Sequence, residues 1–218
     1  IDSFKPLVEQ YLASLKKKKR KESWNDINLN ITKEDHICHF NKEMQNPKTS
    51  IYMILNGEME YNYHNQLYMK ALSDIMDIVY TKTIREEEGG TYGVGVMGQL
   101  TKIPSNSYLF LIAFDTNDDI YQKLINKVYE GLEDVATNGP RQEDLNKVVE
   151  NLYKKRAENL EENSFHTSAI KTLVDDGINI IAEYDEIVKS MTVESIADFT
   201  KEILKSYKKE IVQLPLRQ

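Results

Sequence analysis

Strand-like segments occur in adjacent pairs along this 218-residue chain, and amphipathic helices separate the pairs. The predicted strands cover residues 35–40, 50–60, 91–100, 108–115 and, after several helices, 209–214. Paired strands with helices between the pairs are typical of a largely antiparallel sheet that packs on helices. We therefore predict an α+β fold, a two-layer sandwich of one sheet and its helices.

The helices are indicated by apolar residues spaced three or four apart. In the clearest helix these residues are Tyr68, Leu72, Ile75, Met76 and Val79. This helix is expected to end near Glu88, because glycine at Gly89-Gly90 can adopt the left-handed conformation that closes a helix. Further helices are predicted over 2–15, 119–136, 141–162 and, in several pieces, 164–206.

The predicted strand 91–100 is asymmetric. Tyr92, Val94 and Val96 alternate with Gly93 and Gly95, which leaves one face bulky and the other nearly bare. The strand 108–115 is apolar on both faces, as expected of a central strand. Gly89 to Gly98 hold several glycines, but these follow a helix C-terminus, whereas phosphate groups bind at helix N-termini. Nucleotide binding is therefore not predicted.

The four histidines, His36, His39, His64 and His166, do not have the spacing of a helical zinc motif. Such motifs place two histidines four residues apart on one helix face, beside a glutamate, and neither HExxH nor HxxEH occurs here. His36 and His39 are three apart in a predicted strand and so point to opposite faces, as on an ordinary strand surface. The single cysteine, Cys38, excludes a disulfide within the chain and a Cys-based zinc site. We expect no metal ion and no cofactor in these residues.

Charge and hydropathy exclude further classes of protein. The net charge is −7, yet Lys16–Lys21 is a run of six basic residues. Such a run indicates either nucleic-acid or anionic-lipid binding or a solvated linker, and the lack of interleaved aromatic residues favours the linker. The longest apolar run, Tyr108–Phe114, is far shorter than the roughly 20 residues that span a bilayer, so no membrane span is expected.

The most informative segment is Ile84–Tyr92, with the sequence IREEEGGTY. It places Arg85 in the last turn of a helix and Tyr92 at the start of the next strand, and a glycine corner joins them. The two polar side chains are expected to converge at the mouth of the sheet. An equally weighted alternative is an arginine that compensates the helix dipole and an ordinary strand tyrosine.

This segment resembles the pitrilysin/insulinase family of zinc metallopeptidases, which includes the mitochondrial processing peptidases. Their non-catalytic half carries an arginine and, seven positions later, the tyrosine of a glycine–tyrosine corner, and Arg85 and Tyr92 have this spacing. Weaker similarities follow in the same order along the chain, at 4–15, 139–145, 161–165, 191–194 and 212–215. His166 departs from the pattern, because a tryptophan often stands there in the family.

The resemblance implies the LuxS/processing-peptidase-like fold and two parts of the chain. Residues 1–33 would be the trailing helix and basic linker of a preceding repeat domain, and 34–218 the C-terminal repeat domain. Ile1 lies in a helical pattern, so we expect a mature product or a part of a longer protein. Arg85 would bind a substrate carbonyl and Tyr92 the tetrahedral oxyanion beside zinc, while HxxEH and a distal glutamate in another domain hold the metal.

The implied function is a substrate-clamping domain of a zinc metalloendopeptidase that closes like a clamshell around peptides and is inactive alone. Its expected partners are peptide substrates and an N-terminal catalytic half, in the same chain or in a partner subunit. The alternative is a non-catalytic partner or assembly subunit of a peptidase heterodimer or larger complex. Retention of both Arg85 and Tyr92 favours the first. Bacterial relatives are often exported, so a periplasmic location is preferred.

Overall fold

The computed structural model describes residues 2–16 and 32–216. The strands are β1 His36–Lys42, β2 Thr49–Glu58, β3 Val94–Thr101, β4 Ser107–Thr116 and β5 Tyr207–Pro215. The α-helices are α1 Lys5–Val8, α2 Tyr63–Tyr80, α3 Tyr121–Asn138, α4 Gln142–Leu160, α5 Asn163–Asp176, α6 Tyr184–Lys189 and α7 Val193–Leu204. Two segments are π-helical, η1 Glu9–Ala13 and η2 Thr81–Glu87. No helix in these ranges is long and apolar enough to cross a membrane.

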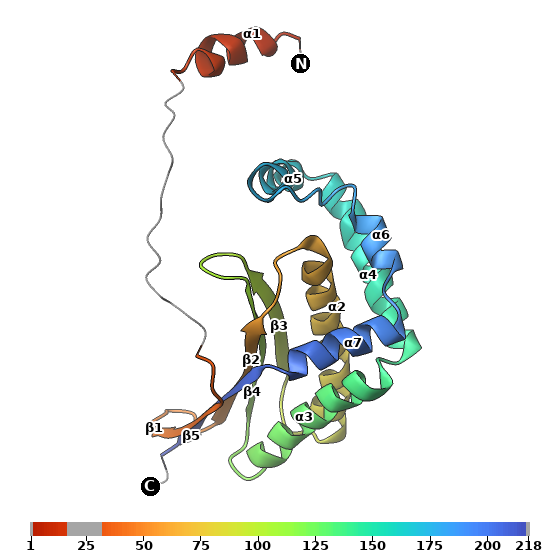
Figure 1. Cartoon of the computed structure of the whole chain (residues 1–218). Helices are drawn as coiled ribbons and strands as arrows, with labels where there is room; N and C mark the ends of the chain where they lie inside the picture. Colours follow the sequence, from red (N-terminus) through yellow and green to blue (C-terminus); the bar gives the residue numbers. More distant parts are fainter. Residues whose placement is uncertain (1, 17–31, 217–218) are drawn as a thin grey trace.

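The strands form one mixed sheet in the order β1-β5-β2-β4-β3. The C-terminal strand β5 lies between β1 and β2, pairing with β1 in parallel and with β2 antiparallel. The remaining pairs, β2 with β4 and β4 with β3, are antiparallel. Figure 1 shows this sheet beside its helices, and the predicted α+β sandwich is confirmed.

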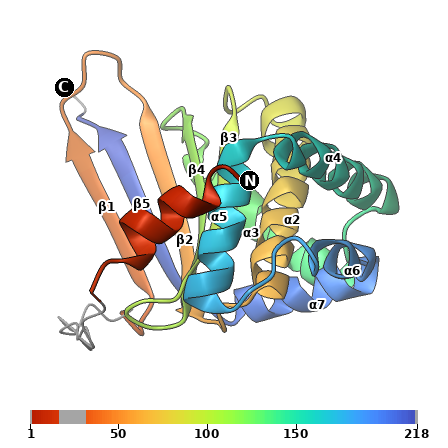
Figure 2. The same ribbon diagram turned by 90° about the horizontal axis from the view of Figure 1, so that it is seen from above.

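The helices cover one face of the sheet and leave the other open. Seen from above, α2, α4 and α7 lie on the same side of the strands (Figure 2). Ile51, Met53 and Leu55 of β2 point toward these helices and are buried. The intervening Tyr52 points the other way and is 44% exposed. We call this second side, away from α2 and α7, the open face of the sheet.

A close approach of β3 to α2 fixes the helix layer on the sheet. A Cβ atom at Gly98 would lie 2.5 Å from Cγ and Sδ of the buried Met69 and 2.7 Å from the Ser73 hydroxyl. Such distances are far inside van der Waals contact, so only glycine allows this separation between helix and strand. Gly98 is therefore a packing residue of the core.

Arg156 of α4 ties the following helices together. Its guanidinium lies 5.0 Å from the ring centre of Phe165 in α5 and 4.7 Å from that of Tyr184 in α6. It also donates a hydrogen bond of 3.1 Å to the carbonyl of Ile181, between these helices. Cation–π contacts of this kind gain strength where the charge is shielded from water, and Arg156 is buried.

The predicted N-terminal helix is present as α1 followed by η1, over Lys5–Ala13 rather than 2–15. Its apolar side chains, including Leu7, Tyr11 and Leu12, are exposed, and it lies away from the sheet (Figure 1). Of the basic run, residues 17–21 lie outside the described residues. The division into 1–33 and 34–218 stays a prediction.

The third strand begins later than expected, at Val94 instead of Thr91. The Thr91 hydroxyl donates to the carbonyl of Gly93 at 3.0 Å and accepts from its amide at 3.3 Å. A side chain that bonds its own backbone in this way offers an alternative to the sheet ladder. Tyr92 therefore belongs to a bend, and the predicted alternation holds only from Val94 onward.

Gly98→Ala is expected to lower the free energy of unfolding by about 1–3 kcal/mol, because the added methyl group overpacks the contact with Met69. The matched control is Gly95→Ala on the opposite face of β3, where an added Cβ meets only the Ala113 carbonyl oxygen, at 3.7 Å. That variant should keep or gain about 0.5–1 kcal/mol, since glycine is unfavourable within a strand. Chemical denaturation of both variants measures the difference, and equal stabilities would contradict the packing role of Gly98.

Candidate functional site

The corner between η2 and β3 is built by a buried anchor and a glycine turn. Ile84 is fully buried and fixes the last turn of η2 on the core. Gly89 follows with φ +61°, the left-handed conformation that the sequence predicted for this helix end. The amide of Gly90 then donates to the carbonyl of Ile84 at 3.4 Å, which closes the turn.

Gly90 is held from two sides. The Thr116 hydroxyl, at the end of β4, donates a 2.5 Å hydrogen bond to the Gly90 carbonyl. A Cβ at Gly90 would lie 2.7 Å from Cδ1 of Leu124 and 2.9 Å from Cδ1 of Ile120. Any larger residue would force the corner away from α3, so this glycine sets where the chain leaves the helix layer.

The two predicted site residues lie on either side of this corner. Arg85 lies in the last turn of η2 with an exposed side chain, and Tyr92 is 100% exposed in the bend before β3. Within the described part of the chain, no hydrogen bond, ion pair or ring contact engages either side chain. The expected convergence of Arg85 and Tyr92 therefore stays a prediction.

Tyr92 borders two pockets. The first, of about 290 Å³, lies on the open face of the sheet, and its lining includes Tyr52, Gly93 and Ala113. The second, of about 530 Å³, lies toward Pro47 and includes Gly89 and Gly90. Thr91, Tyr92 and Asp115 line both pockets. The exposed tyrosine therefore lies where a ligand in either pocket would meet it.

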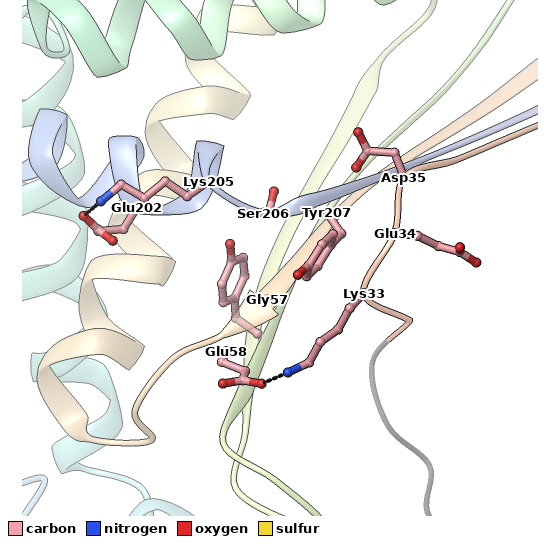
Figure 3. Close-up of a pocket in the computed structure, with 10 residues that line it drawn as sticks. Lys33, Glu34, Asp35, Gly57, Glu58, Glu202, Lys205, Ser206 and Tyr207 are labelled. Carbon is pink, nitrogen blue, oxygen red and sulfur yellow. Dashed lines mark hydrogen bonds and ion pairs between the residues drawn. The ribbon is translucent and has the colours of Figure 1, made fainter.

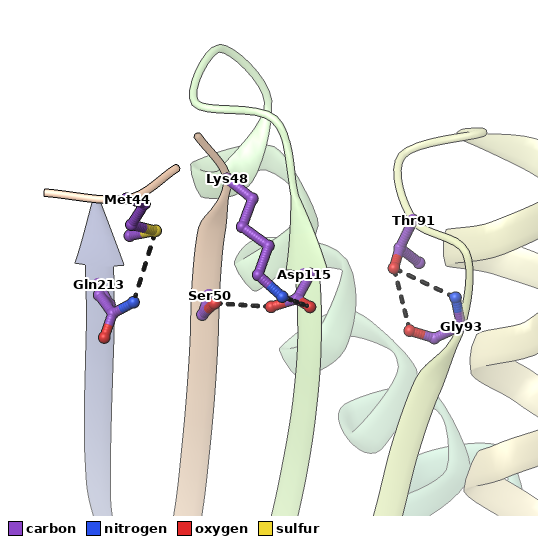
Figure 4. Close-up of polar contacts among 7 residues, drawn as sticks. All are labelled: Met44, Lys48, Ser50, Thr91, Gly93, Asp115 and Gln213. Atoms are coloured by element: carbon purple, nitrogen blue, oxygen red, sulfur yellow. Dashed lines mark hydrogen bonds and ion pairs between the residues drawn. The ribbon is translucent and has the colours of Figure 1, made fainter. Parts of the chain in front are cut away.

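A charged pair lies beside these pockets, at the end of the sheet (Figure 4). One carboxylate oxygen of Asp115 accepts a 2.6 Å hydrogen bond from the Ser50 hydroxyl, and the other pairs with the Lys48 ammonium. Burial alone would raise the pKa of Asp115, but the hydrogen bonds from Lys48 and Ser50 and the Lys48 charge outweigh it and lower the pKa. The carboxylate is thus ionised at neutral pH and neutralised by its partner.

This pair was missed by the sequence analysis. Lys48, Ser50 and Asp115 are brought together by the pairing of β2 with β4, in which Ser50 lies opposite Asp115. The available signal was a single carboxylate at the end of an otherwise apolar strand, and no local pattern identifies its partner.

The histidines do not form a metal site. His36 and His39 occupy β1 positions opposite Lys209 and Val212, three residues apart and so on opposite faces, as predicted. His39 contacts Glu210 at 3.0 Å, and Nε2 of His166 lies 2.9 Å from the Leu160 carbonyl oxygen. Within residues 2–16 and 32–216, no three His, Cys, Asp or Glu side chains are grouped so that they could hold a metal ion. These residues therefore do not fit a zinc ion.

A larger pocket, of about 690 Å³, opens at the opposite end of the sheet, beside Gly57 and Tyr207 (Figure 3). Its charged lining is largely paired within itself, as Lys33 contacts Glu58 at 2.6 Å and Lys205 contacts Glu202 at 2.5 Å. It shares no lining residue with the two pockets beside Tyr92. It is a separate feature from the Arg85–Tyr92 corner.

Solved protease structures share this fold. The periplasmic protease PqqL from Escherichia coli superposes with a TM-score of 0.81 at 17% identity over 99% of this chain and 24% of its own. A protease from Helicobacter pylori gives 0.77 at 14% identity over 98% of this chain and 52% of its own. The ferredoxin protease FusC, solved with Arabidopsis ferredoxin, gives 0.74 at 13% identity, over 97% and 23%. The chain thus spans between a quarter and a half of these proteins.

No curated protein sequence matches the chain. A family model described as the Peptidase M16 inactive domain matches residues 1–152, more than half of the chain. Together with the fold, this match confirms the resemblance that the Arg85–Tyr92 segment indicated. The chain belongs to the Peptidase M16 inactive domain family.

Proposed function

We propose that the chain is the substrate-clamping C-terminal domain of a zinc metalloendopeptidase, and that Arg85 and Tyr92 contact the peptide during its hydrolysis. The observation that carries this proposal is the fully exposed Tyr92 beside a glycine corner that packs against α3, with no partner among the described side chains. Large aromatic side chains normally bury their rings, so an unpartnered ring beside two pockets indicates contact with a ligand.

Arg85 binds a backbone carbonyl of the substrate. Its guanidinium is permanently charged and presents several N–H donors in a planar fork, so it orients a carbonyl more firmly than a lysine ammonium does. The buried Ile84 beside it holds the last turn of η2 in place. Arg85 is thus a long donor on a fixed base, which suits the positioning of an extended peptide.

Tyr92 stabilises the negative charge that develops on the attacked carbonyl oxygen. A phenol hydroxyl donates a hydrogen bond to an oxyanion, and a fixed donor aimed at developing charge favours the transition state over the ground state. The Gly90 contacts with α3 and Thr116 hold the backbone near Tyr92, which limits the reorganisation that this bond requires.

The metal belongs to another part of the protein in this proposal. The described residues of this chain do not fit zinc, and the family match is to an inactive domain. An HxxEH-bearing half, in the same chain or in a partner subunit, would supply the metal and the activated water. That the solved relatives are longer than this chain supports such an arrangement.

Peptides or unfolded segments of proteins are the proposed substrates. FusC is described as a ferredoxin protease and was solved with ferredoxin, so a related fold takes part in acting on a protein. We propose a periplasmic location in a bacterium, because PqqL, which has the same fold, is a periplasmic protease.

Tyr92→Phe in the full-length protein is expected to lower kcat for peptide cleavage by about 10²–10³-fold, the usual effect of removing one oxyanion donor. The midpoint of unfolding should not change, since the hydroxyl contacts nothing in the described residues. Steady-state kinetics and thermal unfolding measure the two quantities. The matched control is Tyr207→Phe at the opposite end of the sheet, which should leave kcat unaltered.

An unchanged kcat in Tyr92→Phe would refute the proposed role. That result would favour the alternative of a non-catalytic partner or assembly subunit, because such a subunit has no need of an oxyanion donor.

The isolated 218-residue chain, supplied with Zn²⁺, is expected to cleave no peptide, because its described residues offer no metal site. A fluorogenic peptide assay with the full-length protein as positive control measures this. Cleavage by the isolated chain that a chelator abolishes would show that a catalytic metal binds here.

A further inference from the structure

We propose that the pocket between Tyr52 and Tyr92, on the open face of the sheet, is a subsite for one uncharged aromatic or aliphatic side chain of the bound peptide. This inference rests on the proposed function, since the same peptide contacts Tyr92. We call this pocket the open-face groove; its lining residues are Ile51, Tyr52, Thr91, Tyr92, Gly93, Ala113, Phe114 and Asp115.

The floor of the groove is formed by residues with very small side chains or none. Ala113 of β4 lies opposite Tyr52 on one side and opposite Gly95 on the other, so all three share the open face. A Cβ at Gly93 would meet nothing within 4 Å, and one at Gly95 would meet only the Ala113 carbonyl oxygen. Core packing therefore does not demand these glycines, unlike Gly98 on the opposite face. Gly93 and Ala113 line the groove, and their small side chains leave open the space in which a substrate side chain fits.

Two aromatic rings flank this floor. Tyr52 is 44% exposed and Tyr92 is 100% exposed, although both are large enough to bury a wide apolar surface. A side chain placed between them would cover both rings, and aromatic pairs add about 0.5–1.5 kcal/mol beyond simple area burial. Met97, two residues beyond Gly95, is 47% exposed and extends the apolar surface away from Tyr92.

The charge at the rim selects against charged residues. Asp115 is the ionisable group that lines the groove apart from its two tyrosines, and its carboxylate oxygens are already engaged by Ser50 and Lys48. A basic substrate side chain would have to compete with Lys48, and an acidic one would meet the Asp115 charge. A neutral side chain neither competes with Lys48 nor is repelled by the Asp115 carboxylate.

The groove is small. Its volume of about 290 Å³ lies at the low end of the range for small-molecule pockets, about 300–1,000 Å³, and is enough for one side chain of a peptide. An extended peptide that runs past Tyr92 would therefore place one residue in the groove, and that residue would set the cleavage preference.

The test uses the full-length protein and peptides that differ at one position, occupied in turn by Phe, Leu, Ala, Lys or Glu. We expect kcat/KM to favour Phe and Leu at one position near the cleaved bond. Ala113→Leu should fill the groove and reduce that preference by about tenfold or more, the usual worth of a change in an apolar pocket.

The matched control is Gln99→Leu, which adds a leucine to the same face of the sheet, on the neighbouring strand β3, but outside the groove lining. It should keep the wild-type preference. Gly93→Leu is a second groove-filling variant, in case Ala113→Leu fails to fold, because Gly93 lines the groove, has no positive φ, and a Cβ there would meet nothing within 4 Å. Retention of the preference in a folded groove-filling variant would overturn the inference.

A photo-crosslinking peptide tests occupancy without turnover. A peptide with benzoylphenylalanine at the preferred position should crosslink to residues of the open-face groove, and mass spectrometry should locate the crosslinks at 52, 91–93 or 113. Crosslinks elsewhere, or none, would overturn the inference.

If Tyr92→Phe lowers kcat while groove-filling variants change nothing, the subsite fails and the proposed function stands. If Tyr92→Phe leaves kcat unchanged but the crosslinks map to the groove, the proposed role of Tyr92 fails and the subsite stands.

Discussion

The contact of Gly90 with α3 is the constraint on which the candidate site depends. A Cβ at Gly90 would lie 2.7 Å from Leu124 and 2.9 Å from Ile120, so a larger residue would force a shift, and the Thr116 hydroxyl donates to the Gly90 carbonyl. The corner is thereby fixed to the helix layer and to the end of β4 at the same time. Tyr92 follows two residues later, and its ring is fully exposed beside the sheet.

The two faces of β3 have different roles: one packs on the helices and the other borders the open face of the sheet. Gly98 faces α2, where Met69 leaves no space, while Gly95 faces outward, where nothing fills the space. A strand with glycine on both faces is weak by itself, because glycine loses much conformational freedom on folding. The close helix contact on one side accounts for Gly98, and a ligand in the open-face groove would account for Gly93, which lines it just before β3.

Local signals in the sequence were sufficient to predict the order and type of most elements. The apolar stripe from Tyr68 to Val79 predicted α2, and Gly89 adopts the left-handed conformation expected at a helix end. Thr192 caps the start of α7 in a capping box with Ser195. These features depend on residues within a few positions of one another, which is why the sequence reveals them.

Features that depend on distant pairing were not predictable. The insertion of β5 between β1 and β2 joins residues more than 150 positions apart, and no local pattern encodes it. The same holds for the pairing of Lys48 and Ser50 with Asp115. The π-helical widening at η2 and the Thr91 bend were also missed, because both replace regular hydrogen bonds with alternatives that propensity does not distinguish. For the candidate site, the spacing of Arg85 and Tyr92 indicated the family that the family model confirms, while the roles of the two residues stay predictions.

The central claim is that Arg85 and Tyr92 of this domain contact the peptide whose bond is cleaved. A crystal structure of the full-length protein, inactivated at its metal-binding half and bound to a substrate peptide, tests it most directly. The account predicts the Arg85 guanidinium and the Tyr92 hydroxyl within hydrogen-bonding distance of backbone carbonyl oxygens at or beside the bond to be cleaved. A peptide bound in the catalytic half with both side chains still facing solvent would contradict it.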